Sequence, residues 1–288
     1  MPGQRVFTLV ALAGLLSIVS PTSGQSLLLD LPRDCQHATV IQRVGITDII
    51  INYHRPMAKG RQIWGKLVPY GEVWRAGANE NTTITFIDDV TIEGLPLAKG
   101  VYGLYMIPNE NEWTVIFSKI HTDWGSYTYD PAHDALRVKV RPQPCEMREA
   151  LDYEFDDVTP DSTTATMRWE KRAVSFKINL NVHDIVRASL PLQLHGGVQY
   201  SWNGWDDAAN YLLSQKFALE DALKYEDSCH WQRKALRQPP DEIPNPRRYG
   251  PKGRSRRREK RSFVRRHRRP TVLLCRLDEI RRQTRRCL

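Results

Sequence analysis

Short stretches of alternating apolar and polar residues follow one another from about residue 36 to residue 182. They are rich in β-branched and aromatic residues, which is typical of strands. Turn sequences such as Glu93-Gly94, Lys99-Gly100 and Thr159-Pro160-Asp161 separate them, with no helical period between. The predicted strands are 47–53, 82–88, 101–107, 112–119, 136–140, 151–155, 162–169 and 173–181. This order favours a mainly β fold, an antiparallel β-sandwich or barrel-like sandwich over residues 36–182.

Beyond residue 182 the apolar spacing changes to the helical period. A first predicted helix covers 183–194 and is broken by Pro191, and two more cover 203–215 and 217–226. Segment 183–227 therefore looks like a short helical segment ending in one tetratricopeptide-type hairpin. Because a single hairpin of this type cannot bury its apolar face, it either docks on the β domain or is followed by further repeats.

The last sixty residues show neither period and are dominated by arginine. Residues 229–288 carry 21 Lys and Arg against 5 Asp and Glu, whereas residues 1–228 carry 21 against 28. The globular part is therefore acidic, and the net charge of +9 is no guide to its partners. Segment 228–288 is a disordered basic arm, a frameshifted reading or a folded basic domain, and we expect no nucleic-acid partner despite its charge.

The first residues predict export. Arg5 precedes an apolar run, Val6–Val19, and Pro21 and small residues follow up to Gly24. This is the pattern of a secretory signal peptide, residues 1–24, cleaved before Gln25; the alternative is an uncleaved anchor. The run is shorter than the roughly 20 apolar residues of a membrane span, and no later segment approaches that length. We expect a periplasmic or extracellular protein with no transmembrane segment after cleavage.

The cysteines, and the absence of known catalytic and metal-binding motifs, limit the chemistry that we expect of this chain. In an oxidising compartment Cys35 and Cys145 can pair as a disulfide, the alternative being two free thiols. The chain has no CxxC, HExxH, GxSxG, P-loop or GxGxxG sequence. His121 and His133 do not form a recognisable metal pattern. We therefore expect no metal and no cofactor.

One irregular connection, residues 54–81, interrupts the strands and carries the residue types of a ligand site. Its cations can bind carboxylate or phosphate, and its rings can stack on a sugar. The candidate ligand-binding residues are Arg55, Lys59, Arg61, Trp64, Tyr70, Trp74, Arg75, Asn79 and Glu80. The alternative is structural: Arg75 pairs with Glu80, the tryptophans plug the end of the sandwich, and the glycines serve turns.

A second aromatic cluster, Trp124, Tyr127 and Tyr129, lies in a loop between two predicted strands. Extracellular sandwiches bind glycans through such rings, and the alternative is partial burial against the sheet edge. A catalytic interpretation is also open. It takes Glu80 with Asp88 or Asp89 as the two carboxylates of a glycoside hydrolase.

Several blocks of the chain resemble one family. They are Tyr53-His54-Arg55-Pro56, Lys59-Gly60-Arg61, Leu67-Val68-Pro69-Tyr70-Gly71, Val73-Trp74-Arg75, Gly77-Ala78-Asn79-Glu80, Gly100-Val101-Tyr102-Gly103-Leu104, Glu112-Trp113-Thr114-Val115-Ile116-Phe117 and Asp123-Trp124-Gly125. Together these blocks resemble the domain-of-unknown-function family 2911 (DUF2911) over about residues 37–182. The resemblance implies an exported bacterial protein whose β domain precedes tetratricopeptide-like helices.

The resemblance supplies no reaction, because the family has no established activity. We expect a non-enzymatic module of the cell envelope that binds a small molecule, a glycan or a protein partner. The alternative is a carbohydrate-active hydrolase that uses Glu80 with a second carboxylate.

Overall fold

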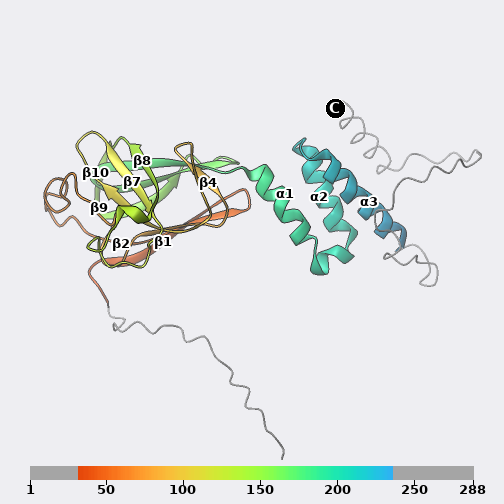
Figure 1. Cartoon of the computed structure of the whole chain (residues 1–288), viewed down its shortest axis with the longest axis horizontal. Helices are drawn as coiled ribbons and strands as arrows, with labels where there is room; N and C mark the ends of the chain where they lie inside the picture. The colour runs from red at the N-terminus through yellow and green to blue at the C-terminus, as the bar shows by residue number, and fades with distance from the viewer. Residues whose placement is uncertain (1–31, 236–288) are drawn as a thin grey trace, which may run out of the picture.

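The computed structural model describes residues 32–235, without the side chains of residues 232–235. The predicted signal peptide, residues 1–24, lies outside the described residues, and so does the Arg-rich segment from residue 236 onward. Figure 1 shows the strands gathered into one unit, from which three helices extend in a row.

Two antiparallel sheets make up the strand unit, which confirms the predicted mainly β fold class. In spatial order, the first sheet contains β1 (Gln36–Val44), β2 (Thr47–Arg55), β3 (Thr83–Phe86), β6 (Gly100–Ile107), β7 (Trp113–Ser118) and β8 (Asp134–Val140). The second contains β5 (Leu95–Leu97), β4 (Val90–Ile92), β10 (Ser162–Asn179) and β9 (Gln143–Asp156). Residues from both sheets share one hydrophobic core, so the sheets pack face to face.

The strands are more numerous than the sequence pattern predicts, and β9 and β10 are much longer. Predicted strands 162–169 and 173–181 are one continuous strand, β10, whose register against β9 shifts on either side of Glu170. Glu170 has a left-handed φ of 54°, so a β-bulge interrupts the alternation at this point. The additional strands are β1, which is mostly exposed, and β4 and β5, which have three residues each.

Three α-helices follow the sheets: α1 (Val182–Gln193), α2 (Trp202–Ser214) and α3 (Leu219–Ala235). Short 3-10 turns are η1 (Pro131–His133) and η2 (Gly196–Tyr200). The predicted break at Pro191 is wrong, because α1 continues through it. Pro191 stands in the last turn, where its missing amide removes a single helical hydrogen bond. Between residues 32 and 235, no helix combines the length and the apolar character needed to cross a membrane.

Only two residues, Leu180 and Asn181, connect β10 to α1. The Leu180 amide donates to the Asp161 carbonyl at 2.8 Å. The Asn181 side chain accepts a hydrogen bond from the Asp184 amide and so caps α1. Both connecting residues are therefore held in place by hydrogen bonds.

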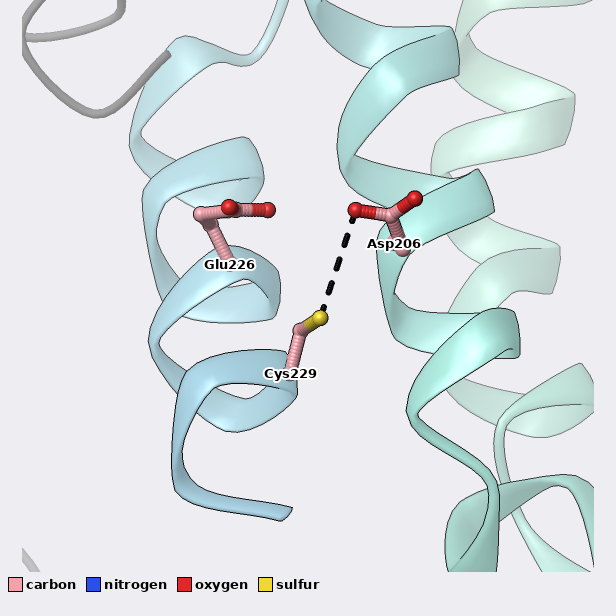
Figure 2. A group of neighbouring side chains, drawn as sticks. All are labelled: Asp206, Glu226 and Cys229. Atoms are coloured by element: carbon pink, nitrogen blue, oxygen red, sulfur yellow. Dashed lines mark hydrogen bonds between the residues drawn. The ribbon is translucent and has the colours of Figure 1, made fainter. Parts of the chain in front are cut away.

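Helices α2 and α3 pack side by side. The buried residues of the pair are Ala208, Ala209 and Leu212 on α2 and Ala222, Glu226 and Cys229 on α3. In Figure 2, Glu226 and Cys229 are directed toward Asp206 of α2. Because α3 continues to Ala235, the predicted helix end at residue 226 is too early, and the helix includes the first residues of segment 228–288.

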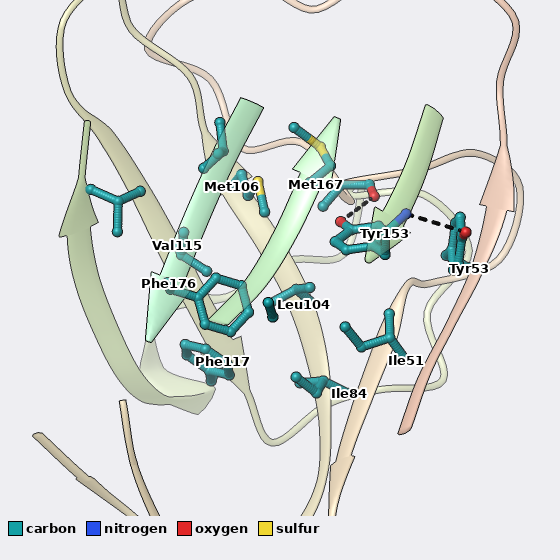
Figure 3. Close-up of a cluster of buried hydrophobic side chains, with 14 of the residues drawn as sticks. Ile51, Tyr53, Ile84, Leu104, Met106, Val115, Phe117, Tyr153, Met167 and Phe176 are labelled. Carbon is teal, nitrogen blue, oxygen red and sulfur yellow. Dashed lines mark hydrogen bonds between the residues drawn. The ribbon is translucent and has the colours of Figure 1, made fainter. Parts of the chain in front are cut away.

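Large apolar side chains of the two sheets meet in the core (Figure 3). Phe117 of β7 packs edge to face on Phe176 of β10, with ring centroids 5.5 Å apart. The buried tyrosines satisfy their polar groups. Tyr53 accepts a hydrogen bond from the Tyr153 amide at 3.2 Å, and the Tyr153 hydroxyl donates to the Ala76 carbonyl at 2.8 Å. The second of these bonds ties connection 54–81 to β9.

Four tryptophans fill one end of the core. Trp64 and Trp74 come from connection 54–81, Trp113 begins β7, and Trp169 lies in β10. The Trp64 ring meets Trp113 edge to face at 4.8 Å, and Trp74 stacks on Trp169 at 5.9 Å. The irregular connection is therefore anchored by its own side chains between the two sheets.

We expect Trp169→Ala to lower the free energy of unfolding by about 3–5 kcal/mol, because it empties the space between Trp64 and Trp74. Trp169→Phe should cost clearly less, since the Trp169 indole N–H donates to none of the described residues. Urea unfolding of the full-length variants measures both effects. Equal losses in the two variants would contradict the packing role.

Candidate functional site

Connection 54–81 holds most of the candidate residues, and two of its arginines bind inside the fold. Arg55 Nε donates to the Leu151 carbonyl at 2.9 Å, which links β2 to β9. Arg61 donates to the carbonyls of Met57 and Ala58 and so closes its own turn. Because both guanidinium groups already have backbone partners, neither is a strong candidate for binding a ligand.

The remaining residues of the first half of the connection are also structural. The Lys59 amide donates to Glu149 at 2.7 Å, and the Lys59 ammonium lies 3.3 Å from Asp34. Tyr70 is partly exposed, and its ring covers Gly65. Trp64 and Trp74 are buried in the core, so they offer no stacking face to a ligand.

The second half of the connection meets the loop that carries the second aromatic cluster. Glu80 and Trp124 form an isolated antiparallel bridge. The Asn81 amide donates to the Asp123 carbonyl at 3.0 Å, and the Gly125 amide donates to the Asn79 carbonyl at 3.3 Å. Two segments that the sequence presents as separate candidates are therefore one site.

We call the exposed part of this site the Arg75 surface, formed by Arg75, Glu80, Trp124 and Tyr127. Trp124 and Tyr127 are 56% and 85% exposed, so their rings face solvent. Gly125 lies beneath them with a φ of +82°, and a Cβ there would come within 2.9 Å of the Tyr127 ring and 3.9 Å of Arg75 Nη1. The absence of a side chain at Gly125 thus allows the ring and the guanidinium to approach the same backbone.

Tyr129 does not belong to the surface. Its hydroxyl donates to Asp134 at 2.7 Å and accepts from Arg137, and its ring packs on Tyr105. Burial, followed by the Asp134 carboxylate, raises the pKa of Tyr129 to about 12. This part of the aromatic cluster is packed against the sheet.

Glu80 lies between two basic side chains. Its Oε1 accepts from Arg33 at 2.5 Å, and its Oε2 lies 3.3 Å from His54 Nε2. Burial raises the pKa of Glu80, but the Arg33 hydrogen bond and the nearby cations outweigh it, so the pKa is lowered. Burial also lowers the pKa of His54, against the opposing effect of Glu80. Glu80 is therefore a carboxylate and His54 a neutral imidazole at pH 7.

Arg75 has no such partner. The Arg75–Glu80 pair of the structural alternative is not formed, because Arg33 and His54 occupy the carboxylate. Among the described residues Arg75 makes no ion pair, and its Nε is buried without a hydrogen bond. Burial lowers the pKa of Arg75, opposed only by Tyr127 and Cys35. Arg75 is a partly desolvated cation that no carboxylate of the described residues neutralises.

The carboxylate pair of the catalytic interpretation is not assembled. Asp88 accepts from the Thr47 hydroxyl at 2.6 Å, and Asp89 accepts from the Lys99 amide at 2.8 Å. Asp88 binds Thr47 at the start of β2, whereas Glu80 lies beside His54 near its end, so the rise along β2 separates the two carboxylates by roughly 20 Å. Glycosidases hold their two carboxyl groups about 5–9.5 Å apart. Asp88 and Asp89 are turn residues, and neither partners Glu80.

Comparison with known proteins gives one match. The family model described as "Protein of unknown function (DUF2911)" matches residues 35–178. The chain belongs to the DUF2911 family. No curated protein and no solved structure matches it. The resemblance seen in the sequence is thus confirmed for the β domain, and the match contains every residue of the Arg75 surface.

The disulfide proposed for this DUF2911 protein is not formed. Cys35 and Cys145 are both free thiols. Cys35 lies beside Asn79, which donates to its carbonyl, whereas Cys145 lies near Arg148 and Arg168 on β9 and β10. The two cysteines have different neighbours, so they do not face each other.

One group of side chains in the DUF2911 protein has the composition of a metal site. Asp206, Glu226 and Cys229 place their ligand atoms within 4.8 Å of one another between α2 and α3 (Figure 2). Two carboxylates and a thiolate could hold a divalent cation such as zinc. The sequence analysis missed this group, because only Glu226 and Cys229 are one helical turn apart and Asp206 lies on another helix.

A cavity lies elsewhere, where the helices leave the sheets. It has a volume of about 440 Å³ and is mainly apolar. Its lining includes Gly45 of the β1–β2 turn and Val186, Leu190 and Tyr211 of the helices. None of the residues predicted for the site lines it.

We expect the Glu80 contacts to make stability depend on pH. Because the folded state lowers the pKa of Glu80, its carboxylate stabilises the fold above the unfolded value of about 4.3, and the effect is lost as the pH falls through the folded value. Glu80→Gln should therefore be less stable than the unmodified chain at pH 7, by less than about 1 kcal/mol because the pair is exposed to water. The difference should shrink as the pH falls below that unfolded value.

Urea unfolding between pH 3 and pH 7 measures this difference. Glu72→Gln, at an exposed position of the same connection, is the matched control and should show no such pH dependence. A constant gap between Glu80→Gln and the unmodified chain over the whole range would contradict the electrostatic origin.

Proposed function

We propose that this DUF2911 protein is an exported, non-enzymatic module of the cell envelope that binds an anionic ligand on the Arg75 surface. The observation that carries the proposal is the half-buried Arg75 guanidinium without a carboxylate partner among the described residues, beside two exposed aromatic rings. A cation that is partly removed from water binds an anion more strongly than a fully solvated cation does.

The arrangement of the neighbouring charges supports an anionic ligand. Arg33 neutralises Glu80, and the low pKa of His54 leaves that imidazole uncharged at pH 7. Lys59 is near Asp34. The surplus charge at the surface is therefore that of Arg75, whose planar guanidinium can make two parallel hydrogen bonds to one oxyanion.

Export and the helical appendage remain proposals that rest on sequence patterns. The leader at residues 1–24 supports a periplasmic or extracellular location. Helices α2 and α3 form a packed pair of the kind expected for one tetratricopeptide-type hairpin. In this proposal the pair is an appendage that follows the binding domain.

The rival proposal, a carbohydrate hydrolase that uses Glu80, is less well supported. A general acid in a glycosidase needs a raised pKa so that it carries a proton near neutral pH. Glu80 has a lowered pKa and is bound by Arg33. An ionised carboxylate that is paired with an arginine is better suited to orienting neighbouring side chains than to donating a proton.

Thermal unfolding of the full-length chain in the presence of carboxylates, phosphates and neutral sugars tests the proposal. A ligand present at about 100 times its dissociation constant adds about 2.7 kcal/mol to the stability. We expect stabilisation by an anionic compound, and we expect it to be lost in Arg75→Gln and retained in Lys66→Gln, which removes an equal charge from an exposed position of the same connection.

Two results would contradict the proposal. One is stabilisation by anions that is the same in Arg75→Gln as in the unmodified chain, which would move the site elsewhere. The other is release of reducing sugar from a glycan in the presence of the protein, abolished in Glu80→Gln, which would favour the hydrolase.

A further inference from the structure

We propose that the ligand of the Arg75 surface is a carboxylated polysaccharide, a chain that contains uronic acid residues. This inference rests on the proposed function and specifies the chemical class of its ligand. It follows from two properties of the surface: the amount of charge that it can neutralise, and the open arrangement of its aromatic rings.

The charge favours a carboxylate over a phosphate. With Glu80 held by Arg33, the positive charge of Arg75 is left without an ion-pair partner among the described residues. One carboxylate carries one negative charge, whereas a phosphate monoester carries about −1.5 to −2 at pH 7. A phosphate would therefore leave part of its negative charge without a counter-charge at the surface. A carboxylate matches Arg75 in both charge and planar geometry.

The rings favour a sugar. A pyranose has an apolar C–H face that packs on an aromatic ring, while its hydroxyl groups at the edge stay hydrated. Trp124 and Tyr127 each combine a flat apolar ring with a polar N–H or O–H group, which suits such an amphipathic ligand. Because the Tyr127 ring lies over Gly125, close to Arg75 Nη1, a ring face and the guanidinium are available to the same ligand.

The exposure of the rings favours a polymer. Pockets for small molecules bury about 70–90% of the ligand, and they need walls. Trp124 and Tyr127 are 56% and 85% exposed, so they form an open surface and not a closed pocket. A chain that extends beyond the surface on both sides can use such a site, because only one or two of its sugar units need to make contact.

Hydrogen exchange of the full-length chain with oligomers of galacturonate, glucuronate or mannuronate tests the inference. This measurement localises binding, which matters because residues 229–288 carry 21 Lys and Arg and can attract any polyanion. We expect at least one oligouronate to slow exchange in residues 75–81 and 123–127, where the Asn81 and Gly125 amides donate to backbone carbonyls. The fully methyl-esterified oligomer should show no effect.

Substitutions assign the contacts. Arg75→Gln and Trp124→Ala should each raise the oligouronate concentration needed for half-maximal protection at least tenfold. Lys66→Gln, at an exposed lysine, and Tyr200→Ala, which removes a ring that is 80% exposed outside the β-sandwich, should leave it unchanged.

The outcomes separate the inference from the proposed function. Equal protection by the esterified oligomer, or protection confined to residues 229–288, would overturn the inference. So would protection at the Arg75 surface by galactose 6-phosphate or phenylacetate but by no oligouronate, although the proposed function would then stand. Absence of protection at the surface by every anion would overturn both.

Discussion

Burial of Trp64 and Trp74 against Trp113 and Trp169 is the interaction on which the candidate site depends. It holds a long connection without regular structure between two sheets. The Trp74 backbone pairs with Met106 in both directions at 2.8 Å, and its indole N–H donates to the Gly77 carbonyl. With Trp74 fixed in the core, the adjacent Arg75 is placed next to Gly125 at the surface. The position of Arg75 is thus a consequence of core packing.

The same connection shows why a count of charged residues is a poor guide to a site. Its arginines and lysines look equivalent in the sequence, yet Arg55 and Arg61 donate to backbone carbonyls and Lys59 lies near an aspartate. Arg33, from before the first strand, neutralises Glu80. Arg75 differs from the others in burial and in partners, two properties that depend on tertiary structure.

The fold class and most elements were predictable from the sequence, because alternation and β-branched residues report burial on one face of a sheet. Predictions failed where the sequence pattern no longer follows burial on one face of a sheet. The bulge at Glu170 splits one strand into two apparent strands, and only the last residue of β1 is buried. At the candidate site, the residue types were predicted. Their sorting into core and surface was not, because rings and cations serve both roles.

Contacts between segments that are distant in the chain could not be predicted from the sequence. Nothing in the spacing indicates that Glu80 bridges to Trp124, or that Arg33 and His54 bind Glu80. Cys35 and Cys145 looked like a disulfide because they are the two cysteines of the globular part, but composition carries no information about distance. The same holds for Asp206, Glu226 and Cys229, which only the packing of α2 on α3 brings together.

The short connection between β10 and α1 determines how the helices are oriented. Since Leu180 and Asn181 are both hydrogen-bonded, the rotational phase of α1 about its axis is set by the strand register of β10. Each residue of an α-helix advances that phase by about 100°. A change of chain length by one residue at this point would thus turn the apolar face of α1 away from Gly45 and remove one wall of the 440 Å³ cavity. Within this family, the junction should tolerate substitution far better than insertion or deletion.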